Sequence, residues 1–446
     1  MQVSRFNYLV SSPKEEGVHF LYNSLHDNRI VVEDGEVKIQ ELLEKVRLKR
    51  SLNQEESEIA LGLKDLGYLL DDHVDEKKLF NQWMKEKVVE QAEVLTVTVT
   101  TTMSCNLRCT YCFEKDQLGK ARMSPETMDK TVEWIKERLA SMGAKRLNLL
   151  FFGGEPLLNI EAIKRISGVL NVYCRDKGIE FSSGAITNGI FLTPTLVDQL
   201  KEWGLSWVKI TFDGNEESHD KRRIYRGGKG TFKRIFDNLE AVSGRLKICI
   251  GGNFDQETVF SFKGLIDKLA HSKFKDDITY TNFKPISPAM VEKGGESNAC
   301  SKCVYKDQEI KDMLELRDYS TKQSLPSSGL NDLGICEFYN RHSLVIGVGG
   351  ELYKCSAFVG QSSTVIGSLE SQEYNQLGNQ MLSVSKPFET EGCRDCSFNP
   401  VCGGGCRADA YNSLGSIEKV SCQKQLIEST VSSFFNEDCQ GDTILN

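Results

Sequence analysis

Three cysteines in the stretch CNLRCTYC have the types and spacing needed for metal chemistry: Cys105, Cys109 and Cys112. Thiolates are the ligands of iron–sulfur clusters, and three of them on one short loop can hold three irons of a [4Fe–4S] cluster. The fourth iron is then free to bind a ligand from outside the protein. Structural zinc fits this loop less well, because zinc needs four closed ligands and is usually held by two Cys-x2-Cys halves.

A second concentration of cysteines lies in the last quarter of the chain. The stretch SLVIGVGGELYKC predicts a hairpin with a Gly-Gly turn that carries Cys355 at the end of its second strand. Three glycines between Cys402 and Cys406 allow the backbone to bend tightly. The seven cysteines of this concentration are Cys336, Cys355, Cys393, Cys396, Cys402, Cys406 and Cys422.

Five further cysteines stand outside these two groups. Cys300 and Cys303 form a Cys-x2-Cys pair on a polar loop rich in glycine and serine. They could supply a further cluster ligand, or they could be exposed thiols. Cys174, Cys249 and Cys439 are isolated, and we expect them to be small buried apolar residues.

Composition restricts the class of protein and its compartment. At 446 residues the chain predicts two to four domains, and 39% hydrophobic with 26% charged residues indicates a soluble globular protein. A net charge of −8 argues against binding to nucleic acid. No apolar run reaches the roughly 18 residues of a membrane span, and the first residues do not resemble a signal peptide. We therefore expect a cytoplasmic protein, in which clustered cysteines are metal ligands or redox groups.

Residues 93–285 alternate short apolar strands with amphipathic helices. The predicted strands are VLTVTVTT, LNLLFF, EFSSGAIT, VKITF, KICIGG and ITYTNF. This pattern predicts an α/β fold with a partial TIM-like (β/α)6 barrel, in which chemistry takes place at the carboxyl ends of the strands. Polar motifs follow the strands as this rule requires: the cysteine loop, then FFGGEP, TNG, TFDGNEESHDKRR and GGNFD.

Residues 1–92 have a different pattern. FNYLV and HFLYNSL predict strands, and NRIVVEDGEVKI predicts a hairpin around its Asp-Gly pair. Two stretches with helical spacing follow, and residues 78–93 predict a linking helix. The sum is a small sheet with about three helices, similar in size to a winged helix-turn-helix. The second helix is acidic, which argues against DNA binding.

The cysteine loop after the first strand and GGEP after the second resemble the radical S-adenosylmethionine (SAM) superfamily. The resemblance implies that Cys105, Cys109 and Cys112 ligate a catalytic [4Fe–4S] cluster whose open iron binds SAM. Reductive cleavage of SAM would give a 5′-deoxyadenosyl radical that removes a hydrogen atom from the substrate. The residues that the resemblance places around SAM are Tyr111 against adenine, Gly153, Gly154 and Glu155 at the methionine amino group, and Asn188, Thr211, Asp213, Arg223 and Asn253 as polar contacts. Without the resemblance, Asp213 would be a turn residue and Arg223 a solvated helix charge.

The seven C-terminal cysteines resemble a SPASM extension with two auxiliary [4Fe–4S] clusters, so the chain would carry three clusters. The resemblance assigns Cys336, Cys355 and Cys406 to the first auxiliary cluster. It assigns Cys393, Cys396, Cys402 and Cys422 to the second. The first is then one ligand short. Either Cys300 or Cys303 supplies that ligand, or an iron is open to a substrate group.

Taken whole, the chain resembles radical SAM/SPASM peptide maturases, and most of all the thioether-forming sactipeptide and ranthipeptide maturases of the freyrasome or SCIFF type. The implied division is a leader-peptide recognition element with its linking helix (1–92), a radical SAM barrel (93–285), a bridging region (286–335) and a SPASM domain (336–446). The implied partners are a precursor peptide and a reductant such as flavodoxin or ferredoxin, with neither nucleic acid nor membrane. Alternatives are a carbon–carbon cross-linking maturase, a sulfatase-activating oxidase, or a non-enzymatic iron–sulfur electron carrier or peptide-binding protein.

Overall fold

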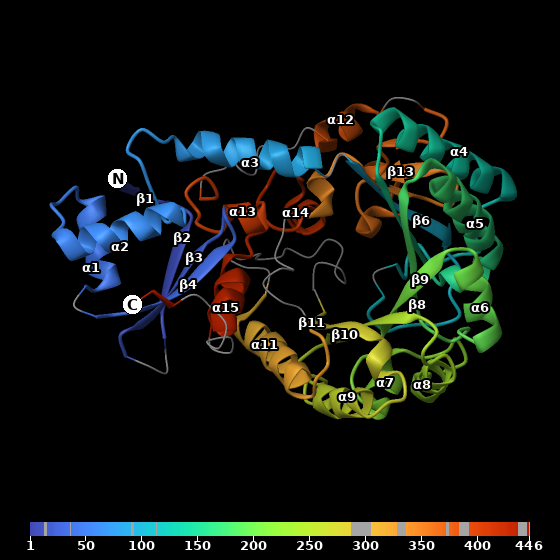
Figure 1. Ribbon diagram of the computed structural model, residues 1–446. Coiled ribbons are helices and arrows are strands. Elements are labelled where there is room, and N and C mark those ends of the chain that lie inside the picture. The colour runs from blue at the N-terminus through green and yellow to red at the C-terminus, as the bar shows by residue number, and fades with distance from the viewer. Residues whose placement is uncertain are drawn as a thin grey trace.

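The fold is described from a computed structural model (Figure 1). The structure describes residues 1–12, 16–35, 37–90, 93–112, 114–286, 305–327, 336–371, 374–382, 392–435 and 444–445. Cys300, Cys303 and Cys439 lie outside these ranges, so the predictions that concern them remain open.

A nine-stranded sheet forms the centre of the larger half of the molecule. Its strand order is β11-β10-β9-β8-β7-β6-β12-β13-β14. The first six are parallel and follow one another along the chain, as the alternation of strands and helices predicts. Their bounds are β6 Val94–Thr102, β7 Arg146–Gly153, β8 Glu180–Thr187, β9 Leu205–Thr211, β10 Lys247–Phe254 and β11 Ile278–Pro285.

Amphipathic helices cover one face of these six strands, and Figure 1 shows them on the outside of the curved sheet. Each strand points alternate residues at the helices, so Val97, Leu149 and Val208 are fully or almost fully buried while their neighbours line the opposite, inner face. The helices are α4 Pro125–Met142, α5 Ile160–Lys177, α6 Pro194–Glu202, α7 Glu216–Arg222, α8 Phe232–Ala241 and α9 Ser261–Ala270. Amphipathic spacing in the sequence predicts helices over 124–142, 160–177, 193–203, 231–243 and 259–271, so all but the short α7 are predicted.

The termini of these helices are set by local chemistry. At α4, the Ser124 hydroxyl accepts a hydrogen bond from the Thr127 backbone amide at 3.1 Å, and Pro125 occupies the first helical position. The helix ends at Gly143, whose φ of 63° lies in the left-handed region that glycine adopts without strain.

The C-terminal region extends this sheet rather than forming a separate one. Strand β12 (Ser343–Ile346) pairs in parallel with β6, and β13 (Glu351–Tyr353) returns antiparallel to it. The predicted Gly-Gly hairpin is therefore confirmed. The other elements of this region are α11 Asp307–Lys322, η5 Glu337–Tyr339, η6 Ser356–Phe358, η7 Ser362–Thr364, β14 Gly367–Ser368, α12 Gln376–Leu382, α13 Asn399–Cys402, α14 Arg407–Leu414 and α15 Lys424–Phe435.

The N-terminal residues build a four-stranded sheet of order β15-β4-β3-β2. The bounds are β2 Asn7–Ser11, β3 Val18–Asn23, β4 Asn28–Glu33 and β15 Ile444–Leu445; β1 Gln2–Val3 pairs with β5 Leu69–Leu70 in a separate two-stranded sheet. The helices are α1 Ile39–Arg47, α2 Gln54–Asp65 and α3 Glu76–Glu90. Strand β15 comes from the other end of the sequence and pairs in parallel with Val31 and Val32 of β4.

Both faces of the N-terminal sheet are covered. One face packs on α1 and α2 through Leu21, Ile30 and Val32. On the other, Phe20 and Val31 pack against C-terminal residues that include Phe398, Ile427 and Val431. Figure 1 shows α13 and α15 lying beside the N-terminal sheet. The two ends of the chain therefore share a hydrophobic core.

Several predictions can now be compared with the structure. The α/β class with a parallel sheet is confirmed, and so is the burial of Cys174. The prediction for Cys249 is wrong, because it lies partly exposed on the inner face of β10. The hairpin predicted around Asp34 is also wrong. The Asp34 carboxylate accepts a hydrogen bond from the Ile39 amide at 3.1 Å, so β4 leads into helix α1. Among the described residues, no helix is long and apolar enough to cross a membrane.

Candidate radical SAM site

The cysteine loop lies at the carboxyl end of β6 and is held by a segment more than 100 residues away. The amides of Arg108 and Thr110 donate to the carbonyls of Ile224 and Arg222 at 2.8 and 3.0 Å. The Arg226 guanidinium donates to the carbonyl of Cys105 at 3.0 Å. These bonds fix the loop backbone between β6 and the segment that follows α7.

The Gly-Gly-Glu step after β7 forms the next wall of the site. Gly153 has a φ of 126°, and a Cβ atom there would lie 2.3 Å from the Thr102 carbonyl oxygen. A Cβ atom on Gly154 would lie 2.5 Å from the Ser104 carbonyl oxygen. Both glycines are therefore required by the close approach of the protein's own cysteine loop. The amides of Gly154 and Glu155 donate to those same two carbonyls at 3.0 and 2.9 Å.

Glu155 is fully buried, and its carboxylate is already well occupied. It accepts hydrogen bonds from the Leu157 amide at 3.0 Å, the Thr187 hydroxyl at 2.6 Å and the Asn188 amide at 2.8 Å. Burial raises its pKa, and these three bonds act in the opposite direction. Because a carboxylate has about four acceptor positions, one remains for a ligand cation. A contact with the methionine amino group of SAM thus stays a prediction, limited to that position.

Tyr111 connects the cysteine loop to the ends of β9 and β10. Its hydroxyl donates to the fully buried carboxylate of Asp213 and accepts from Arg223 at 3.0 Å and from the Asn253 amide group at 3.3 Å. The other oxygen of Asp213 accepts from the Asn253 backbone amide at 2.9 Å. Burial raises the pKa of Asp213, whereas Arg223 and the hydrogen bonds lower it. The Arg223 side chain is only 11% exposed, so the expectation of a solvated helix charge is wrong.

Four polar atoms near the cysteine loop and the strand ends are buried with no hydrogen-bond partner among the described residues. They belong to Asn106 (Nδ2), Thr100 (Oγ1), Arg223 (Nε) and Glu114 (Oε1). Asn106 also accepts from the Asn188 side chain at 2.8 Å, which places it between the cysteine loop and β8. Thr211 ends β9 on the inner face, two residues before Asp213. Buried donors and acceptors without partners are costly, so this set fits a polar ligand such as SAM.

The three thiols of the loop lie close enough to affect one another. Burial first, and then the charges of neighbouring groups that include the other thiols, raise the pKa of the Cys105 thiol to about 12 and that of the Cys112 thiol to about 11. The Cys105 sulfur also accepts from the Leu107 amide at 3.4 Å. Among the described residues, no three such side chains converge as ligands of a single metal ion. A [4Fe–4S] cluster does not require this, since each thiolate binds a different iron.

The C-terminal thiols fall into the two groups that the resemblance implies. In one group, burial raises the pKa of Cys336 and of Cys355, and the charge of Cys406 raises both as well; Cys336 also raises the pKa of Cys355. In the other, the pKa of Cys393 is raised first by burial and then by its three partners, Cys402, Cys396 and Cys422. The structure thus brings each group together, although their role as cluster ligands remains a proposal.

The Gly-Gly-Gly bend between these two groups is forced by packing. Gly403, Gly404 and Gly405 all have positive φ, and a Cβ atom on Gly405 would lie 1.6 Å from the Ser421 carbonyl oxygen. The fully buried Arg407 donates to the carbonyls of Gly404, Ile417 and Lys419, which holds the bend in place.

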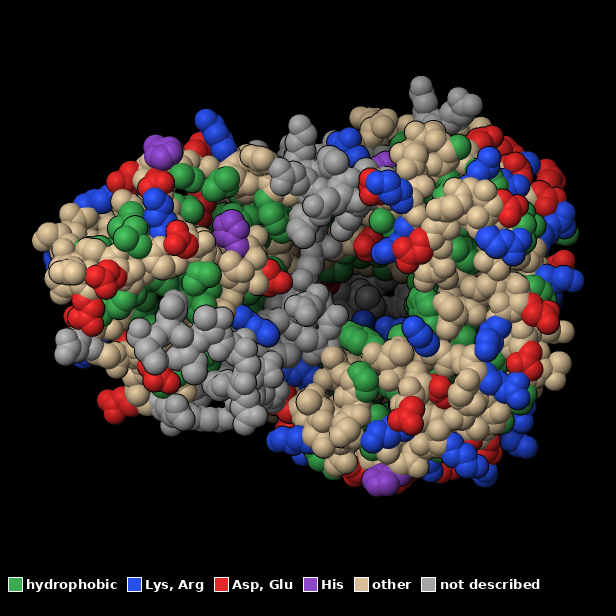
Figure 2. Space-filling model, viewed as in Figure 1, with side chains coloured by type: hydrophobic (Ala, Val, Ile, Leu, Met, Phe, Trp, Pro, Cys, Tyr) green, Lys and Arg blue, Asp and Glu red, His purple; other side chains and the backbone are tan. Residues whose placement is uncertain are grey.

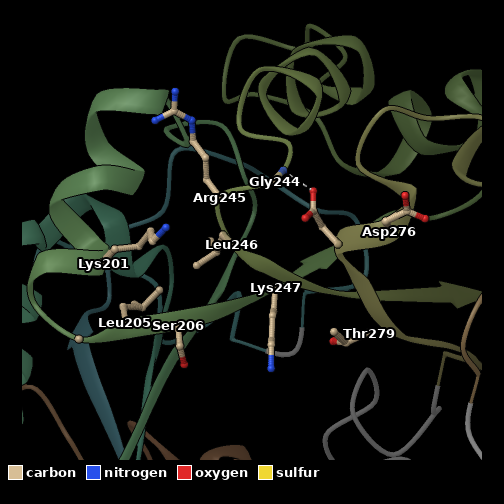
Figure 3. Close-up of a pocket in the computed structure, with 11 residues that line it drawn as sticks. Lys201, Leu205, Ser206, Gly244, Arg245, Leu246, Lys247, Asp276 and Thr279 are labelled. Atoms are coloured by element: carbon tan, nitrogen blue, oxygen red, sulfur yellow. Dashed lines mark hydrogen bonds between the residues drawn. The ribbon is translucent and has the colours of Figure 1, made fainter.

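A separate pocket of about 550 Å³ lies at the amino ends of β9–β11, between Ser206, Lys247, Thr279 and their neighbours (Figure 3). It is at the opposite end of the strands from the cysteine loop. We therefore do not assign it to the site.

Sequence reasoning missed two contributors to the site. Asn106 lies inside the cysteine motif, where only the sulfurs attracted attention, and Arg226 lies beyond the predicted polar motif. Asn106 in CNLRC could have been singled out, because an asparagine in a loop after a strand commonly forms hydrogen bonds with nearby groups.

Comparison with known proteins decides the family of the central region. Residues 99–254 match the model of the radical SAM superfamily. The chain contains a radical SAM domain. That domain implies SAM and one [4Fe–4S] cluster as cofactors, and Cys105, Cys109 and Cys112 lie within the matched residues.

The relatives of this radical SAM chain include a cyclopropyl synthase and a sulfatase-maturating enzyme. It is 21% identical to the radical SAM cyclopropyl synthase TigE of Paramaledivibacter caminithermalis, over 92% of this chain and 89% of TigE. It is 26% identical to the cysteine-type anaerobic sulfatase-maturating enzyme of Clostridium novyi, over 74% of this chain and 93% of that enzyme.

Solved structures share the fold of this radical SAM chain at low sequence identity. Streptococcus suis SuiB, bound to its precursor peptide SuiA, matches 94% of this chain and 98% of its own, with a TM-score of 0.52 and 16% identity. The enzyme anSMEcpe with bound AdoMet matches 77% of this chain and 96% of its own, with a TM-score of 0.57 and 19% identity.

Proposed function

We propose that this radical SAM enzyme modifies a ribosomally made precursor peptide by joining a cysteine sulfur to a carbon of an acceptor residue. The observation that carries the proposal is the combination, in one chain, of a radical SAM domain, two further groups of cysteines and an N-terminal sheet that can receive a strand. The likeness to SuiB, which was solved with its precursor peptide SuiA, and to a sulfatase-maturating enzyme supports a peptide or protein substrate.

The residues that would hold the catalytic cofactors are those described above. Cys105, Cys109 and Cys112 would ligate the cluster, and the unpartnered atoms of Asn106 and Arg223 would receive polar groups of SAM. When bound, these cofactors supply a 5′-deoxyadenosyl radical that removes a hydrogen atom from the substrate. The protein's part is to bury the site and to fix the loop through Tyr111 and Asp213.

Residues 336–446 would hold two auxiliary clusters in the two groups of thiols. The first would use Cys336, Cys355 and Cys406, with a fourth ligand from Cys300 or Cys303 or from the substrate. Thioether formation removes one C–H and one S–H hydrogen, so the peptide loses two hydrogens. The C–H hydrogen leaves as the atom abstracted by the 5′-deoxyadenosyl radical. The S–H hydrogen leaves as a proton, which is released, and an electron, for which an auxiliary cluster is the proposed acceptor. Flavodoxin or ferredoxin would reduce the catalytic cluster in the cytoplasm.

Residues 1–92 would bind the leader of the precursor at the edge of β4. The backbone pairing of β15 there indicates that this edge can take an additional strand. Beside it lies a groove of about 420 Å³ between β4 and helices α1 and α2. Apolar residues such as Val32, Val37 and Ile59 line the groove, together with the acidic residues Glu33, Glu55 and Glu58. An extended leader with apolar side chains and a basic residue would fit it.

The test uses enzyme reconstituted without oxygen, together with SAM, dithionite and a cysteine-containing precursor peptide sought among the neighbouring genes. We expect a loss of two hydrogens per cross-link and the loss of one alkylatable thiol each time. Iron analysis should give about twelve irons per chain, against about eight for the variant with Cys105, Cys109 and Cys112 replaced by alanine. Native peptide that keeps its mass would contradict the proposal.

A second candidate is carbon–carbon bond formation, because the cyclopropyl synthase TigE matches 92% of this chain. Thiol alkylation separates the two reactions. A carbon–carbon bond removes two hydrogens and leaves every cysteine thiol free, whereas a thioether consumes one.

A further inference from the structure

Two lysines stand on the inner face of the last strands of the radical SAM barrel. On β9, Val208 and Ile210 are buried toward the helices, so Lys209 between them lies on the inner face. On β11, Phe283 and Pro285 are buried, so Lys284 lies on the inner face as well. Both strands pair with β10, where Cys249 is the partner of Lys209 and Asn253 is the partner of Lys284.

The Lys209 side chain lies over Gly251 on the intervening strand, close enough to Lys284 for the charge of Lys284 to act on it. A Cβ atom at Gly251 would lie 3.0 Å from Cε of Lys209, so the glycine leaves room for the lysine stem. Burial lowers the pKa of Lys209, and the positive charge of Lys284 lowers it further. Lys209 is partly buried and Lys284 is exposed beside it, and two like charges this close repel one another unless an anion is bound.

No protein carboxylate compensates these charges among the described residues. The inner face of the six parallel strands carries one acidic side chain, Glu180 at the first residue of β8, and it pairs with Arg146 at 2.7 Å. Neither Lys209 nor Lys284 forms a hydrogen bond or ion pair with a described residue. Figure 2 shows a hollow in the middle of this face of the molecule, with Lys and Arg side chains at its border.

We propose that Lys209 and Lys284 together bind a carboxylate of the peptide substrate, from an aspartate or glutamate close to the residue that reacts. The inference rests on the proposed peptide-modifying function and specifies its substrate. Lys284 lies next to Asn253, which contacts Tyr111, so a carboxylate held here lies beside the SAM site. The lysines would select acidic core peptides and set their depth in the barrel.

The carboxylate of SAM is the other carboxylate that the two lysines could bind. The position of the lysines favours a carboxylate of the peptide. They lie on β9 and β11, while the cysteine loop and the Gly-Gly-Glu step follow β6 and β7 at the other side of the strand order. The unpartnered polar atoms of Asn106 and Thr100 also lie on that other side, whereas the unpartnered Nε of Arg223 belongs to the group around Tyr111 and Asp213.

The test combines enzyme and peptide variants in a double-mutant cycle. The enzymes are wild type, Lys209→Gln, Lys284→Gln and the control Lys247→Gln, whose lysine lies at the amino end of β10 in the pocket of Figure 3. The peptides are the native precursor and a series with each Asp or Glu changed singly to Asn or Gln. SAM affinity and peptide-independent SAM cleavage are measured for every enzyme.

We expect one amide peptide to lower kcat/KM of the wild type by about 10- to 100-fold, the effect of losing one charged hydrogen bond. With the native peptide, Lys209→Gln should show a similar decrease in kcat/KM relative to the wild type. Changing to that amide peptide should lower kcat/KM of Lys209→Gln little further. Lys247→Gln should behave as wild type. Peptide-independent SAM cleavage should stay unchanged in all variants. The melting temperature of Lys209→Gln should rise, because a partly buried charge beside the exposed Lys284 is removed, and a higher melting temperature would show that lost turnover is not lost folding.

Two results would overturn the inference. Weaker SAM binding or slower peptide-independent cleavage in Lys209→Gln would assign the lysines to the carboxylate of SAM. If the wild type turned over every amide peptide as fast as the native peptide, the lysines would not bind a carboxylate of the peptide. If wild-type enzyme leaves even the native precursor unmodified, the proposed function fails and the inference fails with it. Modification of the native peptide with no charge dependence removes the inference alone.

Discussion

The Tyr111 hydroxyl on the cysteine loop donates a hydrogen bond to the buried carboxylate of Asp213, 102 residues further along the chain. Arg223 and Asn253 donate to the same hydroxyl, so one oxygen atom joins the loop to the ends of two strands. Both Asp213 oxygens are bonded to protein groups. We therefore expect Asp213 to act on the proposed SAM site mainly as a positioning residue, through Tyr111.

Replacing Tyr111 by phenylalanine should loosen the loop without removing a cysteine. Asp213 and Arg223 would lose a buried partner, which should lower the free energy of unfolding by about 1–3 kcal/mol. SAM cleavage should slow by roughly 10- to 100-fold, because small displacements of reacting groups are costly. Denaturant unfolding and the rate of 5′-deoxyadenosine formation test this. Tyr173→Phe on the outer helix α5 is the control. If iron content stays full and cleavage equals that of wild type, the hydroxyl does not position the loop.

The six parallel strands and five of their helices could be predicted from the sequence because each has a strong local signal. Ser124 and Pro125 mark the start of α4, and the alternation of apolar residues from Val94 marks β6. The order of polar motifs at the strand ends also followed from local pattern. Those ends gather at one edge of a parallel sheet, so the site could be placed before any coordinates were known.

What could not be predicted depends on contacts between distant parts of the chain. No local signal links Phe20 to Ile427 in the shared core, or β12 to β6 in the sheet. The burial of Arg223 is also a tertiary effect, since the residues around it in the sequence are charged and polar. The resemblance assigned the Gly-Gly step only to the methionine amino group of SAM. It is required by the carbonyls of Thr102 and Ser104, whose approach depends on the folded loop.

Gly405→Ala should disrupt one group of C-terminal thiols. The added Cβ atom would collide with the Ser421 carbonyl, next to Cys422, and φ at Gly405 is already 81°. We expect about four fewer irons per chain, with the SAM-binding cluster retained. Gly415→Ala is the matched control, because its φ of 72° imposes similar backbone strain but no atom lies within 4 Å of the added Cβ. Equal iron loss in both variants would show that backbone strain, not the collision, is responsible.

His219 should make stability depend on pH. It is fully buried, accepts a hydrogen bond from the Asp213 amide at 3.3 Å and contacts the Thr231 hydroxyl at 3.0 Å. Burial, followed by the charge of Arg223, lowers its pKa well below 6.5. Below about pH 6.5 the unfolded chain therefore binds a proton that the folded chain does not, so stability falls as pH falls and is unaffected above that value.

The variant His219→Gln should reduce this pH dependence. Between pH 7.5 and pH 5.5, the loss in free energy of unfolding should be smaller than in wild type by about 1 kcal/mol. Urea unfolding at the two pH values provides the measurement. His271→Gln, at the exposed end of α9, should leave the wild-type slope unchanged. An unaltered slope in His219→Gln would mean that other groups cause the acid sensitivity.

The pairing of β15 with β4 predicts competition with the leader peptide. Ile444 and Leu445 occupy the positions opposite Val31 and Val32, on the edge that the leader would use. A chain that ends at residue 442 should bind a fluorescent leader peptide about 3- to 10-fold more tightly, since one or two backbone hydrogen bonds need not be broken first. Fluorescence anisotropy measures this affinity. Replacing Ile444 and Leu445 by valine keeps a strand-forming backbone and should leave affinity at the wild-type value. Weaker binding by the shortened chain would instead make β15 part of the binding site, and unchanged binding would place the leader on another surface.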